Sequence, residues 1–100
     1  MKALTHNQSV NGWDDDVVPY ICWDRSWTVG EIKTRLRDAE DVERHRLMAW
    51  LMRELKPSEV WYFLTPSQVY EQFDYIQRWL GPAREGWAYL LRTWHEMGRI

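Results

Sequence analysis

The chain has 100 residues, a formal net charge of −2 and a hydrophobic content of 45% that includes eight Trp, five Tyr and two Phe. This length suits one domain and not two, and the acidic balance argues against a general nucleic-acid binder, whose surface is usually strongly basic. Cys22 is the single cysteine and permits no internal disulfide, and no apolar run reaches the length of about 18 residues that a membrane span needs, so we expect a soluble, cytoplasmic protein.

Residues 1–18 are predicted to be a flexible N-terminal tail, followed by a single α-helical domain over residues 19–100. The tail mixes polar and small residues around three consecutive aspartates (14–16) and shows no apolar period. These carboxylates are typical of a solvated charge run, with a cation site as the alternative. Residues 20–24 (YICWD) are apolar up to their final acid, and we expect them to lie extended across the helices because no second strand pattern exists for pairing.

Two helices are predicted in the first half of the chain. Thr28 and Glu31 have the spacing of a capping box, which opens a short helix. Its apolar face comprises Val29, Ile32 and Leu36. A longer helix runs from residue 41 or 42 to Leu55 and ends there because Pro57 disfavours helical conformation in the residue before it. The apolar stripe of this second helix comprises Met48, Leu51, Met52 and Leu55, with Leu47 at its edge.

Two further helices are predicted in the second half. Thr65, Pro66 and Gln68 form a helix-start signal, which opens a helix to Leu80. Its apolar face comprises Val69, Phe73, Ile76 and Leu80. Gly81-Pro82 then predicts a stop and a restart. The last helix covers about residues 82–97, with an apolar stripe of Ala83, Trp87, Leu90, Leu91, Trp94 and Met97.

The predicted fold class is therefore all-α, an irregular bundle of four to five helices with an extended N-terminal segment. Trp61 and Trp87 are predicted to be core residues.

Catalytic chemistry has no clear residue pattern in this sequence. Cys22 lies in an apolar run, and neither His45 nor His95 has a sequence context that marks it as the base for a nucleophile. The three histidines are scattered, His6 being the third, and no glycine-rich loop precedes a helix. We therefore predict no enzyme, no cofactor, and no catalytic, cofactor-binding or metal-binding residues. A small enzyme that uses a carboxylate pair stays open as an alternative.

Binding of another protein is the predicted function. Trp50, Tyr75 and Tyr89 each project away from the apolar stripe of their helix and are predicted to bind a partner. For Trp50 the alternative is that its helix packs on both sides, with Trp50 beneath the N-terminal segment.

Single-stranded nucleic acid is the alternative partner, bound by exposed Trp and Tyr together with arginines such as Arg78, Arg84 and Arg92. A net charge near zero favours a protein partner. No membrane contact is expected, and homo-oligomerisation stays open.

A sequence resemblance points to one kind of partner. It is carried by three motifs: residues 20–24 (YICWD), 46–49 (RLMA) and 59–65 (EVWYFLT). In these motifs the chain resembles a group of short bacterial proteins encoded beside nucleotidyltransferase-fold toxins of the abortive-infection type, and the likeness covers about residues 19–97. The resemblance implies a non-enzymatic, antitoxin-like companion whose partner is such a toxin.

Overall fold

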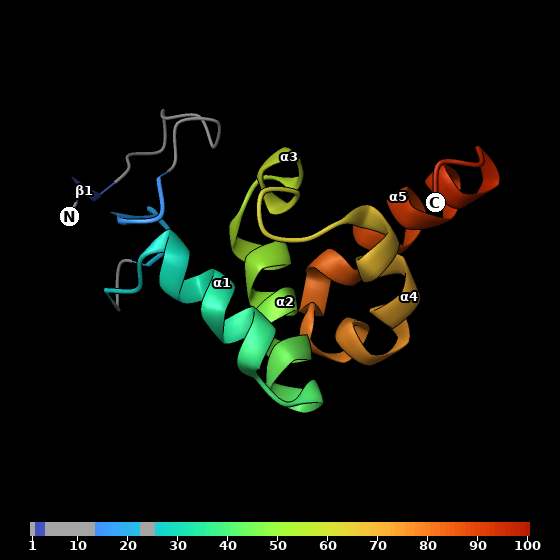
Figure 1. Ribbon diagram of the computed structural model, residues 1–100. Helices are drawn as coiled ribbons and strands as arrows, with labels where there is room; N and C mark the ends of the chain where they lie inside the picture. Colours follow the sequence, from blue (N-terminus) through green and yellow to red (C-terminus); the bar gives the residue numbers. More distant parts are fainter. Residues whose placement is uncertain (1, 4–13, 23–25) are drawn as a thin grey trace. The chain divides into compact units, whose positions relative to one another are not determined.

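The computed structural model describes residues 2–3, 14–22 and 26–100 (Figure 1). The fold is all-α with an extended N-terminal segment, as predicted. The α-helices of the described residues are Val29–Asp38 (α1), Asp41–Glu54 (α2), Pro57–Val60 (α3), Pro66–Ile76 (α4) and Arg84–Glu96 (α5). No helix within these ranges combines the length and the apolar character of a membrane span. The chain divides into two compact units, Met1–Glu40 and Asp41–Ile100.

In the first unit, two very short strands pair in parallel. Strand β1 is Lys2–Ala3 and strand β2 is Val17–Val18, with Lys2 opposite Val17 and Ala3 opposite Val18. Val17 is only 2% exposed, and Pro19, Ile21 and Cys22 are also buried. The sequence pattern predicts no buried residue before position 19, so the burial of Val17 is a feature that only the structure reveals.

The predicted boundary after residue 18 and the predicted flexibility of the tail stay predictions. Residues 1, 4–13 and 23–25, which include His6 and the end of the YICWD motif, lie outside the described residues.

Helix α1 begins at the predicted capping box, which is confirmed. Thr28 Oγ1 accepts a hydrogen bond from the Glu31 backbone N–H at 3.1 Å, and Glu31 Oε1 accepts one from the Thr28 N–H at 3.4 Å. The predicted apolar face of this helix is buried.

Gly30, in the first turn of α1, lies against the segment that precedes the helix. Its N–H donates to the Asp15 carbonyl oxygen at 2.9 Å, and a Cβ at this position would come within 3.2 Å of Asp15. Lys33 on the next turn adds an ion pair with Asp15 at 3.4 Å. Glycine disfavours a helix through its backbone entropy, but here it permits this close approach.

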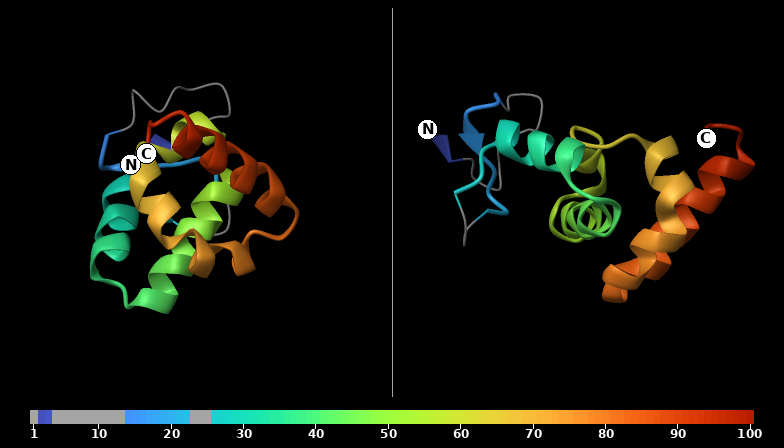
Figure 2. Two further views of the ribbon diagram at one scale, coloured as in Figure 1. Left: turned by 90° about the vertical axis from the view of Figure 1, so that its right-hand side faces the viewer. Right: turned by 60° about the horizontal axis from the view of Figure 1, so that its bottom comes forward.

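In the second unit, the core lies between α2 and the helices of the C-terminal half. Helix α2 packs against α4 and against the 3-10 turn Gln77–Trp79 (η2) that follows α4. Helices α4 and α5 lie side by side (Figures 1 and 2). The buried apolar residues are Leu47, Met48, Ala49, Leu51, Met52, Leu55, Val60, Leu64, Val69, Ile76, Leu80, Trp87 and Leu91. The predicted stripe of α2 is therefore confirmed, and Ala49 joins it.

A cluster of three indole rings connects α5 to the loop after α3. Trp61 contacts Trp87 edge to face, with centroids 5.7 Å apart, and Trp94 in a tilted arrangement at 5.5 Å. The Trp87 Nε1–H donates to the Met52 carbonyl oxygen at 3.1 Å, so the ring is also fixed to α2. Trp87 is buried, as predicted, whereas Trp61 is half-buried.

Helix α3 is a single turn that the sequence pattern does not predict. Proline suits the first helical position, so Pro57 both ends α2 and opens this turn. Glu59 caps the start of this turn, since its Oε1 accepts a hydrogen bond from the Lys56 N–H at 3.1 Å.

Helix α4 ends earlier, and α5 begins later, than predicted. The α-helical part of the predicted 66–80 helix stops at Ile76 and continues as the 3-10 turn η2. Gly81, with φ of +56°, then reverses the chain direction, and a second 3-10 turn, Gly81–Ala83 (η3), precedes α5. Leu80 is buried, but Met97, the last residue of the predicted apolar stripe of the final helix, is 59% exposed. Burial in α5 is confined to Trp87 and Leu91, and the last turn stays at the surface.

The capping box of α4 provides a direct test of a local signal. Thr65 Oγ1 accepts from the Gln68 N–H at 3.1 Å. We expect Thr65→Ala to lower the free energy of unfolding by about 1 kcal/mol, because a helix-terminal N–H loses its acceptor. Urea denaturation measures this, with Ser67→Ala, an exposed serine of the same turn, as the control. Indistinguishable curves for the two variants would contradict the role of the cap.

Candidate functional site

The three predicted partner-binding residues lie on three different helices. Trp50 is on α2, Tyr75 on α4 and Tyr89 on α5. Tyr75 and Tyr89 are each 63% exposed, so the helical phase places both at the surface correctly. The sequence leaves open whether Trp50 is an exposed contact residue or a residue covered from both sides. The structure gives an intermediate result, because Trp50 is half-buried. The binding role of all three stays a prediction.

Tyr75 has its ring held in place by a residue of another helix. Its ring stacks on His45 of α2, with centroids 5.2 Å apart and planes 9° apart. His45 Nε2 is hydrogen-bonded to Gln72 Oε1 at 2.9 Å, and Gln72 lies one turn before Tyr75 on α4. The exposed tyrosine therefore has a defined orientation across α2 and α4.

A second stack of the same kind joins α4 to α5. Tyr70 lies on His95, with centroids 4.6 Å apart and planes 15° apart. His95 Nδ1 is 2.9 Å from the Ile100 carbonyl oxygen, which accepts the hydrogen bond. Within α5, the Arg92 guanidinium lies over the Tyr89 ring at 5.9 Å. Both helices thus present tyrosine rings whose positions are fixed by a basic side chain.

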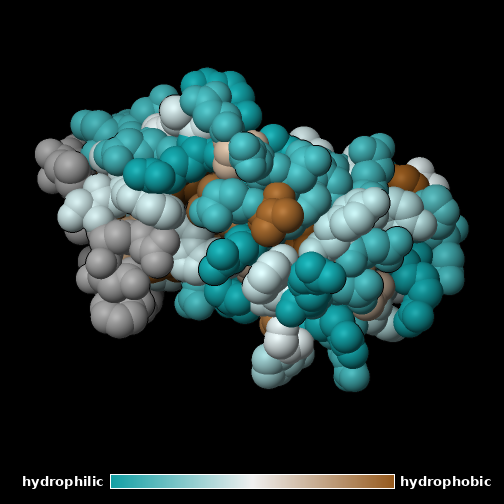
Figure 3. All heavy atoms as spheres, turned by 90° about the horizontal axis from the view of Figure 1, so that it is seen from below, coloured by the Kyte–Doolittle hydropathy of each residue, from teal (hydrophilic) through white to brown (hydrophobic). Residues whose placement is uncertain are grey.

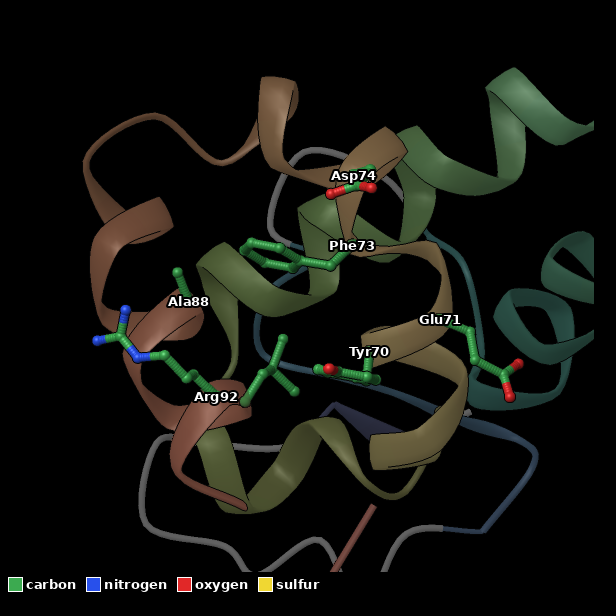
Figure 4. A pocket seen from close by; sticks show the side chains of 7 residues that line it. Tyr70, Glu71, Phe73, Asp74, Ala88 and Arg92 are labelled. Atoms are coloured by element: carbon green, nitrogen blue, oxygen red, sulfur yellow. The ribbon is translucent and has the colours of Figure 1, made fainter. Parts of the chain in front are cut away.

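An open cavity of about 390 Å³ lies between α4 and α5 (Figure 4). Its lining residues are Tyr70, Glu71, Phe73, Asp74, Ala88, Leu91 and Arg92. The rings of Tyr70 and Phe73 reach from α4 toward α5, whereas the carboxyl groups of Glu71 and Asp74 point in different directions (Figure 4). These two acids do not form the converging pair that glycoside hydrolysis uses.

Arginine side chains gather around Trp79, a site that the sequence pattern does not predict. The guanidinium carbons of Arg46 and Arg78 lie 5.1 and 5.9 Å from the centroid of the Trp79 ring. Arg53 Nη1 donates to the Trp79 carbonyl oxygen at 2.6 Å. Helical spacing places Arg46 and Arg53 on the same face of α2 as Trp50, but the approach of Trp79 depends on the packing of η2 against α2.

The surface seen in Figure 3 is mainly hydrophilic, with small separate apolar spots. Within the ranges that the structure describes, no group of three or more His, Cys, Asp or Glu residues is placed to hold a metal ion. Cys22 is buried.

Comparison of the chain with models of known protein families, with curated proteins and with solved structures finds no match in any of the three.

Proposed function

We propose that this protein is a non-enzymatic helical module that works by binding a partner protein. The observation that carries the proposal is the pair of His–Tyr stacks, in which His45 fixes Tyr75 and His95 fixes Tyr70. Tyrosine supplies a large contact area with few rotatable bonds, and a ring that is already oriented loses little further entropy on binding. Such rings are suited to be anchors of an interface.

The partner that we propose is a nucleotidyltransferase-fold toxin encoded beside this protein, with Trp50, Tyr75 and Tyr89 among the contact residues. The toxin comes from the resemblance carried by the YICWD, RLMA and EVWYFLT motifs. Residues 41–100 carry equal numbers of acidic and basic side chains, and this balance supports a protein partner over a nucleic acid.

Co-purification with the product of the neighbouring gene tests the proposal. We expect Tyr75→Ala to weaken the complex by about tenfold or more, as is usual for an aromatic anchor, while the melting temperature changes little because the side chain is mostly exposed. Tyr75→Phe keeps the ring and its stack on His45, so it should retain most of the affinity. Met97→Ala removes an exposed apolar residue that follows α5 and is the matched control.

Trp50→Ala should also weaken the complex, but Trp50 is half-buried, so part of its effect will appear in the melting temperature. Recovery of only uncomplexed protein when the whole locus is expressed would overturn the proposal. Equal affinity of the parent, Tyr75→Ala, Trp50→Ala and Tyr89→Ala would remove these residues from the interface.

Single-stranded nucleic acid is the second candidate partner. The observation behind it is the gathering of guanidinium groups beside Trp79, since clustered cations attract the phosphates of such a strand.

A further inference from the structure

The Arg–Trp79 cluster consists of Arg46, Arg53, Arg78 and Trp79. Its three arginines come from two elements, α2 and η2, which pack against each other. Two guanidinium groups lie over the Trp79 ring, at 5.1 and 5.9 Å, and the third donates to the carbonyl oxygen of the same residue. Three positive charges are thereby brought to one place on the second unit.

Within the described part of the chain, none of these three arginines forms an ion pair with a carboxylate. The ion pairs found there involve Lys33, Arg37 and Arg44. All three arginines of the cluster are exposed. Like charges separated by less than the screening length, about 10 Å at 0.1 M salt, repel one another, and a bound anion removes this repulsion. Each guanidinium offers about five N–H donors, so most donors of the cluster stay available to an acceptor.

The accessibility of the Trp79 ring distinguishes a nucleic acid from an acidic protein segment as the ligand of the cluster. A nucleic acid would need a face of Trp79 for base stacking, but Arg46 and Arg78 already lie over this half-buried ring. A carboxylate needs only the outward N–H groups of a guanidinium, which it binds in a bidentate fork. The arrangement therefore favours the carboxylates of a protein.

We propose that the Arg–Trp79 cluster docks an acidic segment of the partner protein, whose Asp and Glu carboxylates bind to Arg46, Arg53 and Arg78. This inference deepens the proposed function and rests on it. Trp50 lies four residues after Arg46 and three before Arg53, on the same face of α2. A segment that binds both arginines therefore passes beside Trp50, which gives this residue a place in the interface.

A labelled peptide with six Glu spaced by Gly and Ser is the probe, and its affinity is measured by fluorescence anisotropy at low and at higher salt. We expect binding that weakens as salt rises, and a loss of about tenfold or more in the triple variant of the cluster. The substitutions are Arg46→Gln, Arg53→Gln and Arg78→Gln.

A second triple variant is the matched control, because it removes the same amount of charge from dispersed, exposed positions of the same unit. The substitutions are Lys56→Gln, Arg84→Gln and Arg99→Gln. This control should bind within about twofold of the parent, since charges outside the cluster contribute only through screened, long-range attraction. Equal losses of affinity in the two triple variants would overturn the proposal, because the affinity would then depend only on the total charge of the protein.

The probe supplies a test that does not depend on the folding of a variant. The same peptide with Gln in place of Glu should not bind to the unmodified protein, and equal binding of both peptides would overturn the proposal. Tighter binding of a (dT)₆ oligonucleotide than of the Glu peptide, with loss of that binding in the cluster variant, would show that the cluster binds a nucleic acid and not an acidic protein segment. A complex with the neighbouring gene product that survives in the cluster variant, without any binding of the peptide, would overturn this inference alone and leave the proposed function standing.

Discussion

Trp87→Ala is expected to lower the free energy of unfolding by about 3–5 kcal/mol, which is a large part of the stability of a domain of this size. Trp87 is 5% exposed, contacts Trp61 edge to face, and donates its Nε1–H to the Met52 carbonyl oxygen. The substitution therefore leaves a cavity and a buried acceptor without its donor at the same time. Chemical denaturation followed by circular dichroism measures the loss.

Two companion variants separate the contributions of this side chain. Trp87→Phe keeps an aromatic ring but removes the hydrogen bond to Met52, so its effect should be intermediate. Trp61→Ala should cost less than Trp87→Ala, because Trp61 is only half-buried. A melting temperature of Trp87→Ala within a degree or so of the parent would show that this assignment of the core is wrong.

Val17→Asp is expected to destabilise the first unit by about 3–5 kcal/mol, because it forces a carboxylate into a position that is only 2% exposed. Hydrogen exchange of the α1 amides provides the measurement, since opening of this unit accelerates exchange there. Val18→Asp is the matched control: its side chain is half-buried in the same strand, so its effect should be smaller.

The Val17 experiment also decides the predicted flexibility of residues 1–18. A flexible tail would tolerate a charge at either position, so equal exchange of the α1 amides in the parent and in both variants would support a flexible tail. A selective effect of Val17→Asp would instead show that β2 is part of the first unit in solution.

Local signals in the sequence were sufficient for much of the fold. The capping boxes at Thr28 and Thr65 depend on residues three positions apart, and the stripe of α2 depends on helical spacing alone. Both can be read without knowledge of the packing. The 3-10 turn η2 and the exposure of Met97 depend on where the chain meets the rest of the unit. Helix α3 has a local signal in Pro57 and Glu59, but it is too short to show an apolar period.

For the candidate surfaces, too, properties of a single helix could be predicted from the sequence, whereas contacts between helices could not. Helical phase identifies Tyr75 and Tyr89 as exposed, because this property depends on one helix at a time. The partner of Tyr75 could not be predicted, since His45 precedes it by thirty positions in the sequence and reaches it only through the packing of α2 against α4. Trp79 meets Arg46 and Arg53 for the same reason, and only the shared face of the two arginines with Trp50 is visible in the sequence.

The cluster of three indole rings, Trp61, Trp87 and Trp94, gives the second unit a spectroscopic signal that depends on the position of α5. Rings in van der Waals contact at fixed, non-parallel angles couple their electronic transitions and give a chiral signal in the near ultraviolet. Because Trp61 meets both other rings, a displacement of α5 from the loop after α3 would disrupt both couplings together. Binding of a partner that moves α5 can therefore be followed without attaching a label.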